Sequence, residues 1–192
     1  MPTTFISRVR RNHGLEHASI HVLSEKHKNF SAQGNSDHRG FHLNIYGDIS
    51  ETEVSDAVYE AFKRMKNGEH QLAVHPNCGT VLLTTATMAT AAALLPFGIE
   101  QKRRGDSKLD WMTLANVLPT AILAVIATLI ISRPIGVQLQ SKYTVEGDLR
   151  DMVLISVRKI NPSPVTRFFK FLLTAGRGSK MKATAYKIET IG

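Results

Sequence analysis

Apolar residues in the first third of the chain recur with two different periods. From about Thr4 to Lys26 they return with several histidines at helical spacing, which predicts a helix over this range. Residues 41–47 alternate between apolar and polar side chains, which predicts a strand. Ser50 and Glu53 have the spacing of a capping box and precede an apolar stripe, so a second helix is predicted to begin there.

Two shorter segments complete this polar section. Residues 71–76 are apolar enough to form a second strand, so we expect a small β-α-β unit preceded by the first helix. Residues 29–40 are rich in Ser, Asn and Gly and predict a loop.

Two uncharged apolar runs follow, at 80–97 and 112–131. A helix that crosses a bilayer needs about 20 residues, which the second run meets and the first approaches. Pro119 is tolerated if a neighbouring group satisfies the freed carbonyl. We expect a transmembrane helical hairpin, because the flanking polar sections are too small to wrap two such helices. The alternative is a pair of helices buried in a soluble core.

The last section is basic and contains strand patterns at 151–160 and 183–191. Between them, residues 167–173 mix Arg and Lys with Phe and Leu, which fits either a helix at a membrane surface or an ordinary packing helix. The predicted fold is therefore α+β with a transmembrane hairpin and a strand-rich C-terminal tail. The predicted sections are 1–79, 80–132 and 133–192, the last packing on the first.

The formal charge of +8 indicates an anionic partner, which is either lipid headgroups or nucleic acid. The basic residues are scattered and aromatics are only 7%, so we predict a lipid bilayer and no nucleic acid. A larger membrane complex is a further candidate partner. Most of the Lys and Arg lie outside loop 98–111, which favours the inner (cytoplasmic) membrane with both tails cytoplasmic and the loop outside.

Candidate chemistry begins with the H-x-x-E-H string of His13, Glu16 and His17. On a helix, residues four apart share a face, so both imidazoles point the same way. Two neutral imidazoles plus a carboxylate is how a zinc hydrolase places two ligands and a general base, and the inverzincins have the same string. The alternative is a solvated helix face with incidental histidines.

A second motif precedes the first apolar run. His75 and Cys78 flank a Pro-Asn turn, so that both can bind one metal ion. Cys78 stands at the start of the predicted helix, where backbone amides favour the thiolate. Imidazole and thiolate suit Zn²⁺ better than Mg²⁺ or Ca²⁺, so we predict one zinc per chain. Asn12 and Asn77 are further candidates to bind a substrate oxygen.

The two motifs resemble the YqhQ-like family of bacterial membrane proteins, which shows H-G-x-E-H and later H-P-x-C-G-T at the head of a transmembrane segment. They are also similar to a shorter, related family of uncharacterised membrane proteins with R-x-N-H-x-L-E-H-A, matched by Arg10–Ala18, and G-E-H-Q-L-A-V-H-P-N-C-G-T, matched by Gly68–Thr80. The resemblance covers residues 8–97 and implies a metal-dependent enzyme. The residues it implicates are His13, Glu16, His17, His75 and Cys78.

Two functions remain open on this basis. The first is a zinc-dependent integral membrane enzyme, most simply a hydrolase, with Glu16 as the base and His13, His17, His75 and Cys78 as metal ligands. The second is a non-catalytic accessory or assembly protein in which four side chains close a structural metal site.

Overall fold

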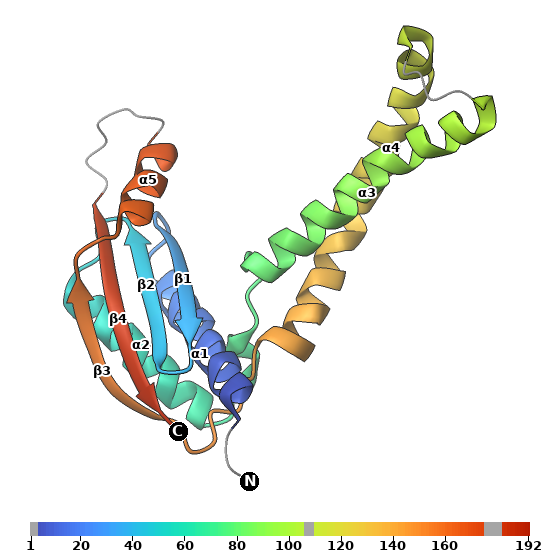
Figure 1. The fold of residues 1–192 in the computed structure, drawn as a ribbon. Coiled ribbons are helices and arrows are strands. Elements are labelled where there is room, and N and C mark those ends of the chain that lie inside the picture. The colour runs from blue at the N-terminus through green and yellow to red at the C-terminus, as the bar shows by residue number, and fades with distance from the viewer. Residues whose placement is uncertain (1–3, 106–109, 175–181) are drawn as a thin grey trace. The chain divides into compact units, whose positions relative to one another are not determined.

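In the computed structural model, which describes residues 4–105, 110–174 and 182–192, a four-stranded antiparallel sheet organises the larger of two units (Figure 1). This unit contains Met1–His75 and Ser141–Gly192, and the other contains Pro76–Gln140. The larger unit consists, in chain order, of α1 (Phe5–Lys26), β1 (Ser31–Asp37), β2 (Gly40–Tyr46), α2 (Glu51–Lys66), the 3-10 helix η1 (His70–Ala73), β3 (Val153–Ile160), α5 (Pro164–Leu173) and β4 (Ala183–Ile191).

The sheet has the order β1-β2-β4-β3, and its buried face is covered by α1 and α2 (Figure 1). Alternation along β2 directs Phe41, Leu43 and Ile45 into this core, opposite Ile188 and Tyr186 of β4. The predicted capping box of α2 is confirmed, with Ser50 and Glu53 bonded reciprocally. The strands predicted at 151–160 and 183–191 are also confirmed, although β3 begins only at Val153, so the described part of the chain is α+β.

Gly14 lies in the middle of α1 because the neighbouring chain leaves no room for a side chain. A Cβ at this position would lie 2.7 Å from the carbonyl oxygen of Glu146 and 3.0 Å from the Cβ of Ala73. Glycine has a low helix propensity, but at this position it allows α1 to lie in close contact with η1 and the 145–149 segment.

Two segment predictions were wrong. Residues 29–40 are not a loop: Ser31–Asp37 forms the edge strand β1, paired residue by residue with β2. This strand was not predicted from the sequence because its residues are polar. None of them is fully buried, so the strand does not need apolar side chains. Residues 71–76 are not a strand, because the 3-10 helix η1 occupies His70–Ala73. The carbonyls of Ala73 and Val74 accept hydrogen bonds from imidazoles of α1 and do not pair with a strand.

The smaller unit is a pair of helices, α3 (Gly79–Arg104) and α4 (Trp111–Leu139), and the π-helical turn η2 (Gln140–Thr144) continues α4 into the larger unit. The helices pack closely through small residues of α4. A Cβ on Gly136 would lie 2.9 Å from the Cα of Val81, and Ser132 donates a hydrogen bond to Thr85 across the pair at 3.1 Å.

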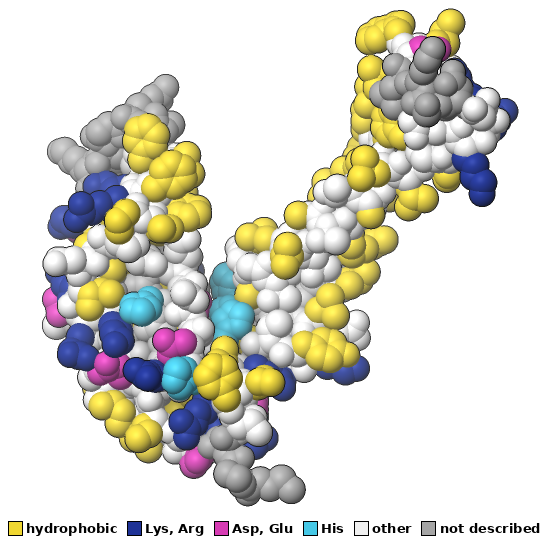
Figure 2. All heavy atoms as spheres, viewed as in Figure 1, with side chains coloured by type: hydrophobic (Ala, Val, Ile, Leu, Met, Phe, Trp, Pro, Cys, Tyr) yellow, Lys and Arg dark blue, Asp and Glu magenta, His cyan; other side chains and the backbone are white. Residues whose placement is uncertain are grey.

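α3 and the segment Trp111–Thr144 are each long and apolar enough to cross a membrane. In their most apolar 18-residue windows, none of α3 and 11% of the second segment is buried. Figure 2 shows the yellow apolar side chains along this unit. α3 continues beyond the predicted end at 97 and stops at Gly105 in the left-handed conformation (φ 68°). The centre of the predicted loop, residues 106–109, lies outside the described residues.

Candidate metal centre

Three histidines of α1 form a ladder on one face of the helix. His13, His17 and His21 are four residues apart, so their rings follow one another along the same side. The ring centroids of His13 and His17 are 4.4 Å apart, and their ligand nitrogens lie within 4.8 Å of each other. These nitrogens are therefore candidate ligands of one metal ion, which, if it were zinc, would hold each at about 2.0–2.1 Å.

Backbone carbonyls fix the protonation of the first two rings. His13 Nδ1 lies 3.0 Å from the carbonyl oxygen of Thr144, and His17 Nδ1 lies 2.7 Å from that of Ala73. A carbonyl only accepts hydrogen bonds, so each Nδ1 carries the proton and the lone pair of each neutral ring is on Nε2. This is the usual arrangement of metal-binding histidines, whose second nitrogen donates to a carbonyl or carboxylate.

His75 lies beside the ladder, with its ring centroid 4.8 Å from that of His21 and 5.8 Å from that of His17. Burial, together with smaller contributions from the neighbouring His21 and His17, lowers the pKa of His75 to about 4. The ring is therefore neutral near pH 7, as a metal ligand must be. His21 donates from Nε2 to the carbonyl of Val74 at 2.8 Å, so its lone pair is on Nδ1.

Glu16 lies on the adjoining face of α1, beneath the edge strand β1. Its carboxylate accepts a hydrogen bond of 2.6 Å from Ser36 and is buried. Gly34 covers it so closely that a Cβ there would lie 2.2 Å from the Glu16 carboxyl carbon. Neither Ser36 nor Gly34 was identified from the sequence, because both lie in the segment predicted to be a loop.

Cys78 follows His75 by three residues and belongs to the smaller unit. It is buried and forms the N-cap of α3, where its sulfur accepts from the amide of Thr80 at 3.5 Å. The larger unit thus brings His13 and His17 together and places the His75 ring beside those of His17 and His21, and Cys78 follows His75 by three residues in the chain. Asn12 is not directed at a substrate, since its amide donates to Asp37 and accepts from Thr190.

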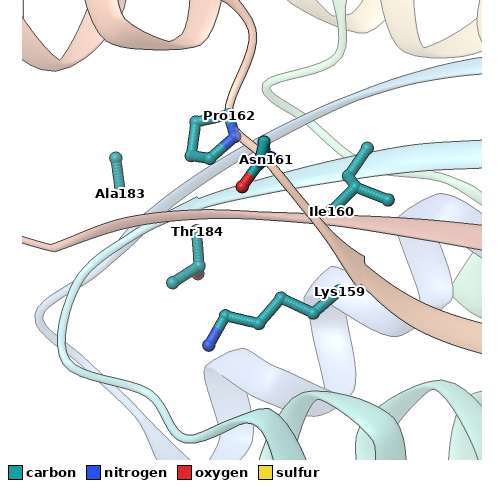
Figure 3. Close-up of a pocket in the computed structure, with 6 residues that line it drawn as sticks. All are labelled: Lys159, Ile160, Asn161, Pro162, Ala183 and Thr184. Atoms are coloured by element: carbon teal, nitrogen blue, oxygen red, sulfur yellow. The ribbon is translucent and has the colours of Figure 1, made fainter.

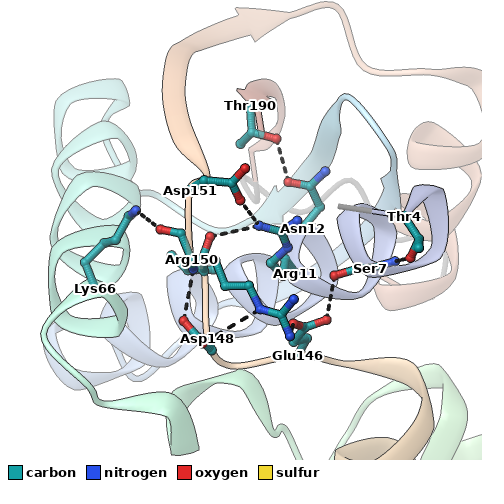
Figure 4. A network of polar contacts seen from close by, with 11 residues as sticks. Thr4, Ser7, Arg11, Asn12, Lys66, Glu146, Asp148, Arg150, Asp151 and Thr190 are labelled. Carbon is teal, nitrogen blue, oxygen red and sulfur yellow. Dashed lines mark hydrogen bonds and ion pairs between the residues drawn. The ribbon is translucent and has the colours of Figure 1, made fainter. Parts of the chain in front are cut away.

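A buried arginine holds the turn of α1 that precedes the histidines (Figure 4). Arg11 is fully buried and donates to the carbonyl of Leu149 at 3.0 Å and to Asp151 at 2.8 Å. Its hydrogen bond lowers the pKa of Asp151. Ser7 adds a bond of 2.8 Å to Glu146. These contacts fix α1 to the chain that follows η2, and hence position Thr144 against His13.

The described residues also contain an open hollow of about 530 Å³ between the end of β3 and the start of β4 (Figure 3). Its lining contains neither a histidine nor a carboxylate, so it does not compete with the imidazole cluster as a metal site. The residues that line it are Lys159, Ile160, Asn161, Pro162, Ala183 and Thr184.

The chain belongs to the family described as Domain of unknown function (DUF6391), whose model matches residues 8–157. It is also 38% identical to an uncharacterised protein of Picosynechococcus sp., in an alignment covering 46% of this chain and 49% of the relative. The chain thus spans about half the length of that relative. No solved structure matches it. The matched family does not carry the YqhQ-like name, so that resemblance remains a hypothesis.

Proposed function

We propose that this protein is a zinc-dependent integral membrane enzyme of the hydrolase type, with both tails in the cytoplasm and the hairpin in the inner membrane. The observation that best supports a metal site is the pair of carbonyls, at Ala73 and Thr144, that place the lone pairs of His17 and His13 on Nε2. The resemblance of both motifs to the YqhQ-like proteins supports the same proposal.

In this proposal His13, His17 and His75 bind the metal, with Cys78 as the fourth ligand or a close neighbour. Bound zinc would supply Lewis-acid activation of water. Glu16 would accept the proton that the attacking water loses, and Ser36 would hold the carboxylate in place through its 2.6 Å bond. An amide or ester bond near the membrane surface is the substrate class we propose.

The proposal for the membrane rests on the exposed side chains of the hairpin. Large apolar residues are exposed along both helices, and contiguous apolar patches of this kind are rare on monomeric soluble proteins. Lipid covers them without any further protein partner. The exposed residues include Leu82, Leu83, Leu94, Leu95, Ile122, Leu123, Ile126, Ile130 and Ile131.

Elemental analysis of the detergent-purified protein tests the metal site. We expect about one zinc per chain, and its loss on single substitution of any of the four proposed ligands. Glu16→Gln preserves shape but cannot accept the proton, so it should retain zinc. If the four ligand substitutions leave the metal content unchanged, the metal proposal is wrong. If Glu16→Gln loses zinc, Glu16 is a ligand rather than the base. The ligand substitutions are His13→Ala, His17→Ala, His75→Ala and Cys78→Ser.

Carbonate extraction and labelling test the membrane proposal. We expect the protein to stay in the membrane fraction at high pH, and complete release would refute the hairpin. A cysteine introduced at Asp106, which lies outside the described residues, should react with an impermeant reagent in intact cells when Cys78 is Ser. Reaction only after permeabilisation would contradict the proposed topology.

A second candidate is a structural zinc site in an accessory or assembly protein of a larger membrane complex. The observation that favours it is the burial of His17, which is only 3% exposed. Four side-chain ligands would close such a site to solvent. Cobalt substitution distinguishes the two, since added azide should change the visible spectrum of an open site and leave that of a closed site unchanged.

A further inference from the structure

The amphipathic helix α5 is oriented with its polar side toward its own domain. Thr166 is buried and donates a hydrogen bond of 3.0 Å to Asn44 on the helix-free face of the sheet. Lys170, one turn later, is the next least exposed side chain of the helix. An ordinary packing helix places its apolar stripe against the core instead, so α5 does not behave as one.

The apolar side of α5 is exposed. At 100° per residue, Val165, Phe168, Phe169 and Leu172 fall within an arc of about 100°, and Phe171 and Leu173 extend it on either side. Phe168 is 57% exposed and Phe171 is 60% exposed. In Figure 2 these yellow side chains gather over α5, with dark blue basic side chains nearby. Six large apolar groups therefore lack cover within the described part of the larger unit.

The charges of α5 are all positive. Arg167 and Lys170 are its ionisable residues, and the helix contains neither Asp nor Glu. A short helix with aromatic and aliphatic side chains on one side and basic residues on the other fits the boundary between acyl chains and anionic headgroups. The basic net charge of the whole chain favours the same surface.

A second copy of the chain is a poorer occupant. A helix of ten residues is about 15 Å long, so one of its faces offers much less than the roughly 800 Å² per partner of a standard interface. A bilayer surface needs no matching partner face. We therefore infer that α5 inserts its apolar side into the surface of a bilayer that contains anionic lipid, as an attachment separate from the α3–α4 hairpin.

Tryptophan quenching in vesicles tests this inference on the full chain. The single tryptophan, Trp111, is first replaced by Phe, and a new one is introduced as Phe171→Trp. The control probe is Tyr59→Trp, at a half-exposed aromatic of α2. Both proteins are reconstituted with brominated phosphatidylcholine, with or without about one-third phosphatidylglycerol. We expect quenching at least twofold stronger at 171 than at 59, with a blue-shifted emission, and stronger again with phosphatidylglycerol.

Equal quenching at the two positions would overturn the inference. A blue shift at 171 without quenching by brominated lipid would also overturn it, because protein rather than lipid would then cover the helix. Carbonate extraction of the same vesicles reports on the hairpin independently. Carbonate-resistant protein with an unquenched Trp at 171 refutes only the α5 attachment. Protein released by carbonate but quenched at 171 before extraction refutes only the hairpin. Phe168→Asp should reduce quenching at 171 without unfolding the sheet, since Phe168 points away from it.

Discussion

Replacing Gly34 by Ala tests whether the edge strand β1 holds the Glu16 carboxylate in place. The added Cβ would lie 2.2 Å from the Glu16 carboxyl carbon, whereas ordinary contact begins near 3.4 Å, so the carboxylate must retreat by about 1.2 Å. That displacement stretches the 2.6 Å bond from Ser36 beyond hydrogen-bonding range. A hydrogen bond to a charged group contributes about 1.5–3 kcal/mol, and overpacking costs about 1–3 kcal/mol. Both effects come from the same displacement of the carboxylate, so their costs do not simply add. We expect Gly34→Ala to lower the free energy of unfolding by about 2–3 kcal/mol in all.

A double-mutant cycle in detergent separates this contact from a general effect on β1. In thermal unfolding followed by circular dichroism, Gly34→Ala should lower Tm by about 4–12 °C. In a Glu16→Ala background the same change should cost almost nothing, because the side chain it displaces is gone. Gly98→Ala, with no neighbour within 4 Å, controls for the added methyl group. Zinc content should not change, because carbonyls rather than β1 orient the two imidazoles of α1. Equal losses in both backgrounds would refute the reasoning.

Three further predictions concern the ion pairs and the metal. Asp151→Asn should destabilise the protein more than Arg11→Met in urea unfolding, by about 1–2 kcal/mol, since it leaves a buried guanidinium without its counter-charge; the reverse order would contradict this. Lys187, then Ser156 and Arg158 lower the pKa of Glu189 to about 2, so its contribution to stability is present above pH 4.5 and is lost as the pH falls toward 2; Glu189→Gln should flatten that part of the curve. Under the proposed function, removal of the metal by a chelator should lower Tm, and the His17→Ala protein should show no such change.

The sequence predicted correctly those elements that depend on residues close to one another in the chain. The capping box at Ser50 and the alternation of 41–47 depend on residues within one turn or one strand, and both are present in the structure. β1 could not be found in this way. Its Gly34 is required because the side chain of Glu16, eighteen residues earlier in the chain, leaves no room for a Cβ. The run 71–76 has apolar strand composition, but its carbonyls at Ala73 and Val74 bond to imidazoles that local reasoning does not consider.

In the candidate site too, features within one helix were predicted, whereas contacts from distant parts of the chain were not. The spacing of His13 and His17 is a property of one helix, so the sequence predicted that the two rings share a face. The groups that fix their tautomers come from Ala73, which is 56 residues after His17, and from Thr144, which is 131 residues after His13. The buried Arg11 was likewise not predicted, since nothing near it in the chain indicates that Leu149 and Asp151 surround it.

The two carbonyls that orient the imidazoles lie at the two ends of the hairpin sequence. Ala73 precedes Pro76 by three residues, and Thr144 follows Gln140 by four. If the hairpin spans a bilayer as proposed, a tilt or a length mismatch of its helices that displaces either carbonyl would alter the orientation of an imidazole. Thermodynamic linkage then requires the reverse effect, so that an ion bound by the imidazoles would bias the arrangement of the helices. Under the proposed function, zinc affinity would depend on bilayer thickness.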